Sequence, residues 1–195
     1  MPGGLSVVLA SASPRRRELL SVVLPHFEVV VPRHEIPPQK GESAHEYALT
    51  AARGKCREVF RERPHSLVIG ADTVVVVDNS ILGKPQDERE AERMLKTLSN
   101  REHQVITGVW VCAPHREEGF TEVSLVRFGE LEQDEIRRYV ASKEPMDKAG
   151  AYGIQGMASC FVEGIKGSYT NVVGLPVRRL YLLLKKLFAT WPQEI

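Results

Sequence analysis

Short apolar runs alternate with amphipathic stretches along the chain, which is the pattern of strands interspersed with helices. The apolar runs predict strands over residues 5–10, 26–32, 66–79, 103–113, 120–128 and 159–165. The dipeptide Asp78-Asn79 is a turn signal at the end of the third run. The fourth and fifth runs are expected to pair, so the sheet should contain both parallel and antiparallel strands.

Helix signals stand between the apolar runs and predict helices over residues 14–22, 43–62, 87–98, 132–142 and 175–191. Ser13 and Pro14 suit the N-cap and first position of the first helix. The sequences SAHE, residues 43–46, and DERE, residues 87–90, have the spacing of capping boxes. With 195 residues, the chain is long enough for one core. We therefore predict a single α/β domain over residues 1–195, a mixed twisted sheet flanked by helices.

Charge and cysteine usage exclude several classes of protein. The 26 basic and 25 acidic residues leave a net charge of +1, which argues against a surface that coats nucleic acid but allows a local basic pocket. Cys56, Cys112 and Cys160 are far apart and odd in number, so we expect free buried thiols rather than a disulfide framework or zinc knuckle. The six histidines form no zinc-protease pair.

No apolar segment reaches the length of a membrane span. The Ala-Ser-Ala triplet at residues 10–12 resembles a signal cleavage site, but no adequate apolar run precedes it and arginines follow it directly. We therefore expect a cytoplasmic protein that does not bind membranes.

The stretch LASASPRRRELL, residues 9–20, places three arginines at the start of a predicted helix, where positive charge is unfavourable. A strand that feeds a helix through small residues offers unpaired N–H groups to an anion. Hydroxyls and bidentate guanidinium groups would add to such a site. The candidate phosphate ligands are Ser11, Ser13, Arg15 and Arg16. The alternative is a solvated charge run on a surface helix, and Arg17 is expected to face solvent in either case.

Two shorter motifs add a carboxylate and lysines. Asp72 in GADT follows an apolar strand, where it could hold a metal or orient water; the alternative is a turn that Asp72 caps. Lys84 in GKP is presented by a turn and suits a polyphosphate, or is an ordinary turn lysine. Lys55 stands among alanines on the second predicted helix and could equally be a surface lysine.

The segment EPMDKAGAYGIQG, residues 144–156, is rich in small residues that let backbone approach a ligand closely. Gln155 stands near its end and offers both a donor and an acceptor, which is the pattern needed for a pyrimidine edge. The alternative is a loop that only bends sharply.

Together these motifs resemble the Maf family, the septum-formation-inhibitor-like nucleotide pyrophosphatases. The resemblance extends from about residue 6 to residue 185 and includes LGKPQDEREAERMLKTLSNREHQVITGV and GSYTNVVGLP. It implies a fold similar to that of inosine-triphosphate pyrophosphatases, with an active-site cleft between two lobes. It also implies hydrolysis of nucleoside triphosphates to the monophosphate and diphosphate, with Mg²⁺ or Mn²⁺ as the metal.

The resemblance implies a role for each matching residue. Asp72 falls on the family's proton acceptor and on its metal site, together with Glu35; many relatives have a second acid where this chain has Ile36. The positions linked to the triphosphate are Ser11, Arg16, Lys55 and Lys84. The positions that separate a dTTP/UTP branch from a 7-methyl-GTP branch are Arg15, Thr73 and Gln155, and all three resemble the dTTP/UTP branch.

The family also implies a homodimer, and either nucleotide-pool house-cleaning or a link to cell-division control. Two other classes of function remain open. A non-catalytic regulator would bind nucleotides or nucleic acid through residues 15–17, 178–179 and 185–186, although stable nucleic-acid binding is not expected from the net charge. A phosphotransferase would use the same phosphate site, but no kinase motif is present.

Overall fold

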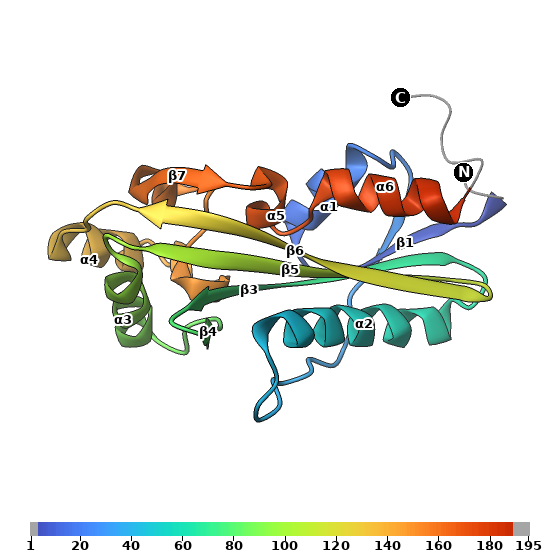
Figure 1. Cartoon of the computed structure of the whole chain (residues 1–195), viewed down its shortest axis with the longest axis horizontal. Coiled ribbons are helices and arrows are strands. Elements are labelled where there is room, and N and C mark those ends of the chain that lie inside the picture. Colours follow the sequence, from blue (N-terminus) through green and yellow to red (C-terminus); the bar gives the residue numbers. More distant parts are fainter. Residues whose placement is uncertain (1–3, 189–195) are drawn as a thin grey trace. The chain divides into compact units, whose positions relative to one another are not determined.

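A seven-stranded mixed sheet organises the structure, a computed structural model that describes residues 4–188 (Figure 1). Its strand order is β2 (Glu28–Val30), β1 (Val7–Ala10), β3 (Leu67–Val77), β5 (Glu102–Ala113), β6 (Arg116–Phe128) and β7 (Val162–Lys166), with β4 (Ser80–Leu82) paired to β3. β1 runs parallel to β2 and β3, whereas β4 and β7 are antiparallel to their neighbours. The predicted mixed sheet is therefore confirmed.

The helices are α1 (Pro14–Ser21), α2 (Ala44–Glu62), α3 (Glu88–Leu98), α4 (Gln133–Ala141), α5 (Tyr169–Val173) and α6 (Val177–Leu187). Three short 3₁₀ helices are η2 (Glu144–Asp147), η3 (Ala149–Ala151) and η4 (Met157–Phe161). The predicted caps of α1 and α2 form, because the Ser13 and Ser43 hydroxyls accept from backbone N–H groups in the first turn. The end of the helix predicted over residues 175–191 lies outside the described residues.

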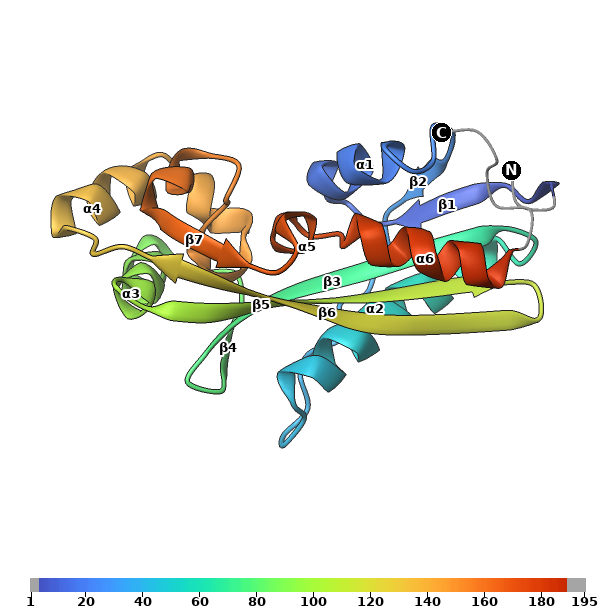
Figure 2. The ribbon, with the colours of Figure 1, turned by 45° about the horizontal axis from the view of Figure 1, so that its top comes forward.

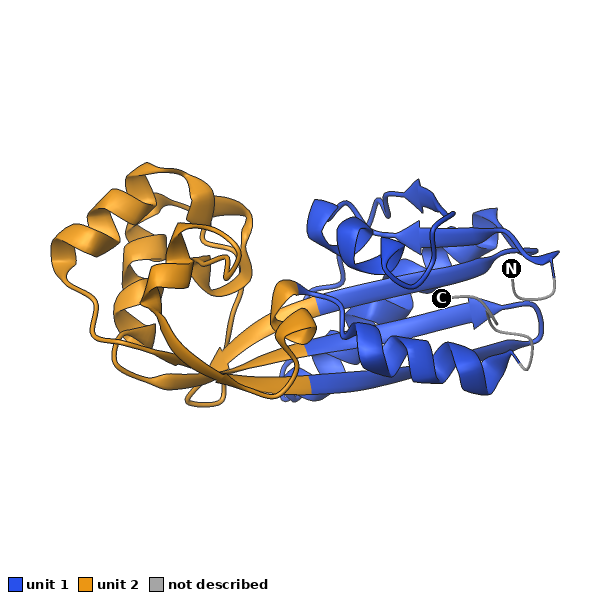
Figure 3. Ribbon diagram, turned by 90° about the horizontal axis from the view of Figure 1, so that it is seen from above, with its two compact units in different colours: residues 1–72, 107–122, 174–195 blue, residues 73–106, 123–173 orange. Residues whose placement is uncertain are grey.

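The described chain divides into two compact units (Figure 3). Unit 1 takes residues up to 72, 107–122 and those from 174 onward, and unit 2 takes residues 73–106 and 123–173. β3, β5 and β6 each contribute residues to both units. The single domain over residues 1–195 stays a prediction.

Both faces of the sheet are buried in unit 1, with α1 and α6 on one face and α2 on the other (Figures 1 and 2). Val7 and Leu9 of β1 belong to the cluster that includes Leu20 of α1 and Leu180, Leu183 and Leu184 of α6. Val8 and Ala10 belong to the cluster that includes Cys56. A parallel strand buried on both faces has no polar positions to alternate with, which is why β1 is a continuous apolar run.

Glycines bring α2 close to the sheet of unit 1. A methyl group at Gly70 of β3 would lie 2.6 Å from the carbonyl oxygen of Ala52, and one at Gly108 of β5 would meet the carbonyl of Ala48. The helix backbone therefore packs directly on the strands, which explains the alanines in the middle of α2. Side chains that flank these alanines are held against β3.

Aromatic rings fill the interior of unit 2. The edge-to-face contacts include Phe128 with Tyr152, whose ring centroids are 4.8 Å apart, and Tyr139 with Phe161. His103 is 2% exposed, and its Nε2 lies 2.8 Å from the hydroxyl of Tyr152. Burial lowers the pKa of His103 to about 4, so the imidazole is neutral near pH 7.

Several local predictions were wrong. The strand predicted over residues 159–165 begins only at Val162, because residues 157–161 form η4. The DERE capping box is half formed: Asp87 accepts from the N–H of Glu90, but the Glu90 carboxylate accepts from the N–H of Gln86. Of the three cysteines predicted to be buried, Cys160 is exposed. The short elements β4 and α5 were not predicted.

Candidate active site

The junction between β1 and α1 in unit 1 folds around the hydroxyl of Ser11, which is buried. This hydroxyl oxygen accepts from the N–H of Ser13 at 3.1 Å and from Nη1 of Arg16 at 3.4 Å. The Ser13 hydroxyl oxygen accepts from the N–H of Arg16 at 3.4 Å. A hydroxyl that accepts keeps its hydrogen for donation, so both serines can still donate to an anion.

Arg16 is fixed in place, whereas Arg17 is exposed as predicted. Nε of Arg16 donates to the carbonyl oxygen of Gly174 at 2.9 Å, which ties the start of α1 to the segment that precedes α6. Burial lowers the pKa of the Arg16 guanidinium, an effect that the Asp72 carboxylate opposes and Arg15 reinforces. The charges of Arg16 and Asp72 therefore act on each other within unit 1.

Lys55 and Asp72 form an ion pair between α2 and β3. Their Nζ and Oδ1 atoms lie 2.6 Å apart, and each side chain is 16% exposed. The close packing of α2 on Gly70 brings the two side chains together. The GADT motif suggested that Asp72 either ends a strand or caps a turn, and both suggestions were wrong. β3 continues past Asp72, because β4 pairs with residues 75–77, beyond Gly70, the last residue that pairs with β1.

Asp72 and two further acids act on one hydroxyl of α2, that of Tyr47. Burial and the carboxylates of Asp72, Glu35 and Glu42 raise the pKa of the Tyr47 hydroxyl. Glu35 and Asp72 therefore act on the same hydroxyl of α2. Within residues 4–188 no three His, Cys, Asp or Glu side chains are grouped as a ready-made metal site.

In unit 2 the GKP and glycine-rich segments are joined. The N–H of Gly150 donates to the carbonyl oxygen of Gly83 at 3.0 Å, next to the exposed Lys84. Gly150 has φ of +68°, and a methyl group there would lie 2.9 Å from the side chain of Val75 on β3. Glycine is thus required by both the backbone conformation and the close approach.

Gln155 is exposed at the tip of a turn in unit 2. The turn is closed by the N–H of Gly156, which donates to the carbonyl oxygen of Gly153 at 3.0 Å. Ile154, the other central residue, is buried, so the turn has one anchored side chain and one exposed side chain. This arrangement presents the amide of Gln155 to solvent.

The structure thus groups the predicted site residues by unit. Unit 1 holds Ser11, Ser13, Arg15, Arg16, Glu35, Lys55 and Asp72, and unit 2 holds Thr73, Lys84 and Gln155. The cleft between two lobes stays a prediction. None of these residues lines either of two surface hollows of about 180 and 390 Å³.

Sequence reasoning missed the residues that support the site. Tyr47 stands eight residues before Lys55 on α2, a spacing that places two side chains near one face of a helix. This spacing could have suggested Tyr47 as a neighbour of the site. Gly174 holds Arg16 through its carbonyl oxygen, which no sequence pattern reveals.

No helix among residues 4–188 is long and apolar enough to cross a membrane.

Curated relatives are similar over nearly the whole chain. A protein of Koribacter versatilis named dTTP/UTP pyrophosphatase is 48% identical over 185 residues, covering 94% of this chain and 95% of the relative. Proteins of the same name from Carboxydothermus hydrogenoformans and a Geobacillus species are 48% and 45% identical, covering 93% of this chain and 98% and 97% of their own lengths.

Among solved structures, a HAM1 protein from Coxiella burnetii matches 93% of this chain and 99% of its own, with a TM-score of 0.50 and 16% identity. This likeness concerns the fold, and it confirms the expected mixed α/β fold of the inosine-triphosphate-pyrophosphatase type. Residues 6–187 match the family described as Maf-like protein, nearly the span over which the sequence motifs indicated it. The chain therefore belongs to the family of Maf-like proteins.

Proposed function

We propose that this protein hydrolyses nucleoside triphosphates, with dTTP and UTP favoured, to the monophosphate and diphosphate. The names of its relatives support the activity. The observation that carries the proposal is the ion pair of Lys55 with Asp72. Unit 1 holds this pair together with the junction of Ser11 and Arg16, which we propose binds an anion. The site thereby combines a carboxylate for a water molecule with cations and hydroxyls for phosphates.

The phosphate groups would be bound at the start of α1. Ser11 and Ser13 donate their remaining hydroxyl hydrogens, and the first N–H groups of the helix add partial positive charge. Arg16, already oriented by Gly174, offers a guanidinium that can bind two phosphate oxygens. Lys84 in unit 2 would contribute a further charge to the triphosphate.

Asp72 would accept the proton of the attacking water. The water oxygen forms a bond to the α-phosphorus, the bond to the bridging oxygen breaks, and diphosphate leaves with its electron pair. Lys55 neutralises Asp72 in their ion pair. Because a triphosphate attracts Lys55 more strongly than one carboxylate does, substrate binding would free Asp72 to act as the base and use Lys55 to bind the leaving diphosphate.

The donor set fits a divalent cation that is held partly by substrate. Asp72 and Glu35 supply two carboxylates, and Mg²⁺ in nucleotide enzymes is commonly bound by one or two carboxylates plus phosphate oxygens and water. When bound, Mg²⁺ or Mn²⁺ would neutralise phosphate charge and lower the pKa of water.

Base selectivity would come from Arg15, Thr73 and Gln155. The amide of Gln155 can donate to a pyrimidine carbonyl and accept from the ring N–H. Guanine also presents a carbonyl beside a ring N–H, so discrimination against GTP would rest on the larger purine ring and its exocyclic amine. Its exposed place at the tip of a turn suits such contacts.

A nucleic-acid-binding regulator is less well supported, because the basic residues of α6 that it would use each contact another side chain of the protein. Arg179 pairs with Glu122, and Lys186 pairs with Glu118 at 2.6 Å. Arg178 and Lys185 both lie over the ring of Tyr181. With the proposed hydrolase activity we also propose a cytoplasmic location and a homodimer.

The test is to incubate the protein with dTTP, UTP and purine nucleotides in the presence of Mg²⁺ or Mn²⁺ and to identify the products. We expect dTMP or UMP and diphosphate in equal amounts. Release of single phosphate, or no turnover of any nucleotide with either metal, would refute the proposal. Transfer of phosphate to an added acceptor without diphosphate release would favour a phosphotransferase.

A further inference from the structure

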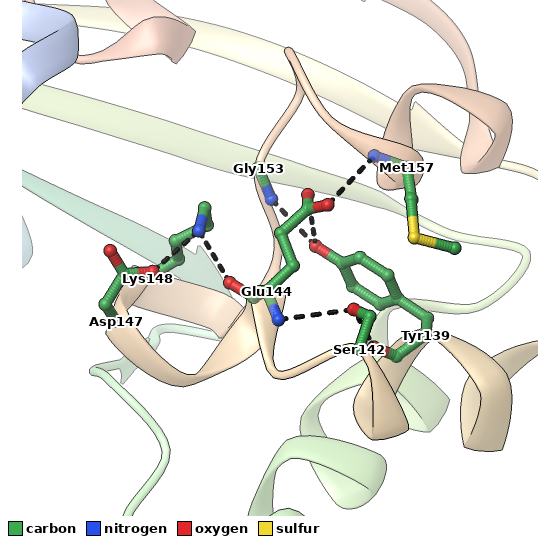
Figure 4. A network of polar contacts seen from close by, with 7 residues as sticks. All are labelled: Tyr139, Ser142, Glu144, Asp147, Lys148, Gly153 and Met157. Atoms are coloured by element: carbon green, nitrogen blue, oxygen red, sulfur yellow. Dashed lines mark hydrogen bonds and ion pairs between the residues drawn. The ribbon is translucent and has the colours of Figure 1, made fainter.

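A single carboxylate holds both ends of the turn that carries Gln155 (Figure 4). Oε2 of Glu144 accepts from the N–H of Met157 at 3.1 Å, directly after the turn. Oε1 of Glu144 accepts from the hydroxyl of Tyr139 at 3.1 Å, and that hydroxyl oxygen accepts from the N–H of Gly153 at 3.2 Å. The turn between Gly153 and Met157 is therefore anchored at both ends.

The backbone of Glu144 is itself held on both sides. The N–H of Glu144 donates to Oγ of Ser142 at 3.2 Å, and Nζ of Lys148 donates to the carbonyl oxygen of Glu144 at 2.6 Å. Tyr139 is 1% exposed and packs edge-on against Phe161. Tyr139 therefore belongs to the packed interior of unit 2, whereas Glu144 is half-buried beside it, and the turn rests on both.

Gly156 confirms how closely the carboxylate approaches the turn. A methyl group at Gly156 would lie 2.5 Å from the carboxyl carbon of Glu144 and 2.7 Å from its Oε2. A side chain at position 156 would therefore displace the Glu144 carboxylate from the place where it accepts from the turn. The turn backbone lies against the carboxylate on one side and leaves Gln155 exposed on the other.

We propose that Glu144, acting with Tyr139, is a positioning residue that sets the base selectivity of Gln155, an inference that rests on the proposed function. A segment rich in glycine and alanine samples many conformations when unanchored, and ordering it on binding costs free energy. Holding both ends of the turn removes that cost before the nucleotide arrives. The Gln155 amide then meets the base in one orientation, which discrimination between bases requires.

Glu144→Ala removes both acceptors, and Glu144→Gln keeps one acceptor but places an amide donor against the other N–H or O–H donor. Tyr139→Phe removes only the relay to Gly153 and keeps the ring packing. Glu163→Ala and Glu163→Gln are the matched controls, because Glu163 is an exposed carboxylate of unit 2 whose ion-pair partner is Arg127.

Each variant is assayed for kcat and KM with dTTP and with GTP. We expect Glu144→Ala to lower the ratio of kcat/KM for dTTP over GTP about tenfold, mainly through KM for dTTP, which corresponds to one lost hydrogen bond to a charged group. Glu144→Gln and Tyr139→Phe should give smaller losses, and the Glu163 variants none. Amide exchange at Gly153 and Met157 should quicken in the Glu144 variants.

The double variant Glu144→Ala/Gln155→Ala separates positioning from general damage. If Glu144 acts through Gln155, the double variant has the same selectivity as Gln155→Ala alone. Additive losses, or an unchanged ratio despite faster amide exchange, overturn the inference. Absence of diphosphate release by the wild-type protein overturns the proposed function instead. Should Glu144→Ala fail to fold, Tyr139→Phe and Glu144→Gln in the Gln155→Ala background decide the question.

Discussion

Nζ of Lys55 lies 2.6 Å from Oδ1 of Asp72, and the two side chains are equally shielded from solvent. The pair joins α2 to β3 at the place where β3 passes beyond its pairing with β1. Each partner neutralises the other. Under the proposed function, both become available together when a triphosphate binds.

Asp72→Asn should lower kcat about a thousandfold, because the amide cannot accept a proton from water. The amide oxygen still accepts from Lys55, so the midpoint of thermal unfolding should change little. The matched control is Asp78→Asn, which alters an exposed aspartate paired with Arg101. Near-normal turnover of dTTP by Asp72→Asn would remove Asp72 from the proposed role.

Chelation should abolish diphosphate release, and added Mg²⁺ or Mn²⁺ should restore it. Glu35→Gln should raise the Mg²⁺ concentration for half-maximal activity about tenfold, because one of two carboxylates loses its charge. Glu42→Gln is the control, since Glu42 also acts on Tyr47 but is not assigned to the metal. Equal metal requirements for the two variants would contradict the assignment of Glu35.

Gly70→Ala should destabilise the protein by about 1–3 kcal/mol, the usual cost of overpacking. The added methyl group meets the carbonyl oxygen of Ala52 and must displace α2 from β3. We expect activity to fall as well, because the same displacement separates Lys55 from Asp72. Gly164→Ala on β7 meets no atom within 4 Å and should leave urea denaturation and turnover unchanged. Equal stability of the two variants would show that α2 can shift without cost.

Buried His103 should make stability depend on pH. Its pKa is about 4 in the folded protein and about 6.5 when unfolded, so between these values the unfolded chain binds the extra proton. The contribution is complete above pH 6.5 and is lost as pH falls toward 4, by at most about 1.4 kcal/mol per pH unit.

Urea denaturation at pH 7, 6 and 5 measures this dependence on His103. His103→Gln should reduce the slope between pH 6.5 and 5, and His65→Gln, at an exposed position, should keep it. Identical slopes for wild type and His103→Gln would exclude His103 as the source.

Local signals were sufficient for much of the fold. The SAHE box opens α2 and the helix ends at Glu62 as predicted, because a cap and its first turn involve only neighbouring residues. For β3 the local signals disagreed: the apolar run over residues 66–79 predicted a strand through Asp72, whereas the GADT motif suggested that the strand ends there. The course of β3 depends on which strand lies beside residues 75–77, and that is decided by long-range pairing.

The candidate site was predictable only in part, and mainly through family resemblance. Composition and spacing left each of Asp72, Lys55 and Gln155 with an ordinary structural alternative. The contact between Lys55 and Asp72 follows from the close packing of α2 on Gly70. The alanines of α2 and the glycine of β3 are consistent with such packing, but they do not determine which helix packs on which strand. Glu144 and Tyr139 carry no motif signal for their contact, since it arises from the tertiary packing of unit 2.

The anchors of the Gln155 turn are backbone groups: Glu144 and Tyr139 receive the N–H groups of Met157 and Gly153, which every amino acid except proline provides. The side chain at the tip contributes nothing to holding the turn. A single codon change at position 155 can therefore replace the group that meets the base while its support stays intact. New substrate preferences can arise in this protein without first sacrificing the fold that presents them.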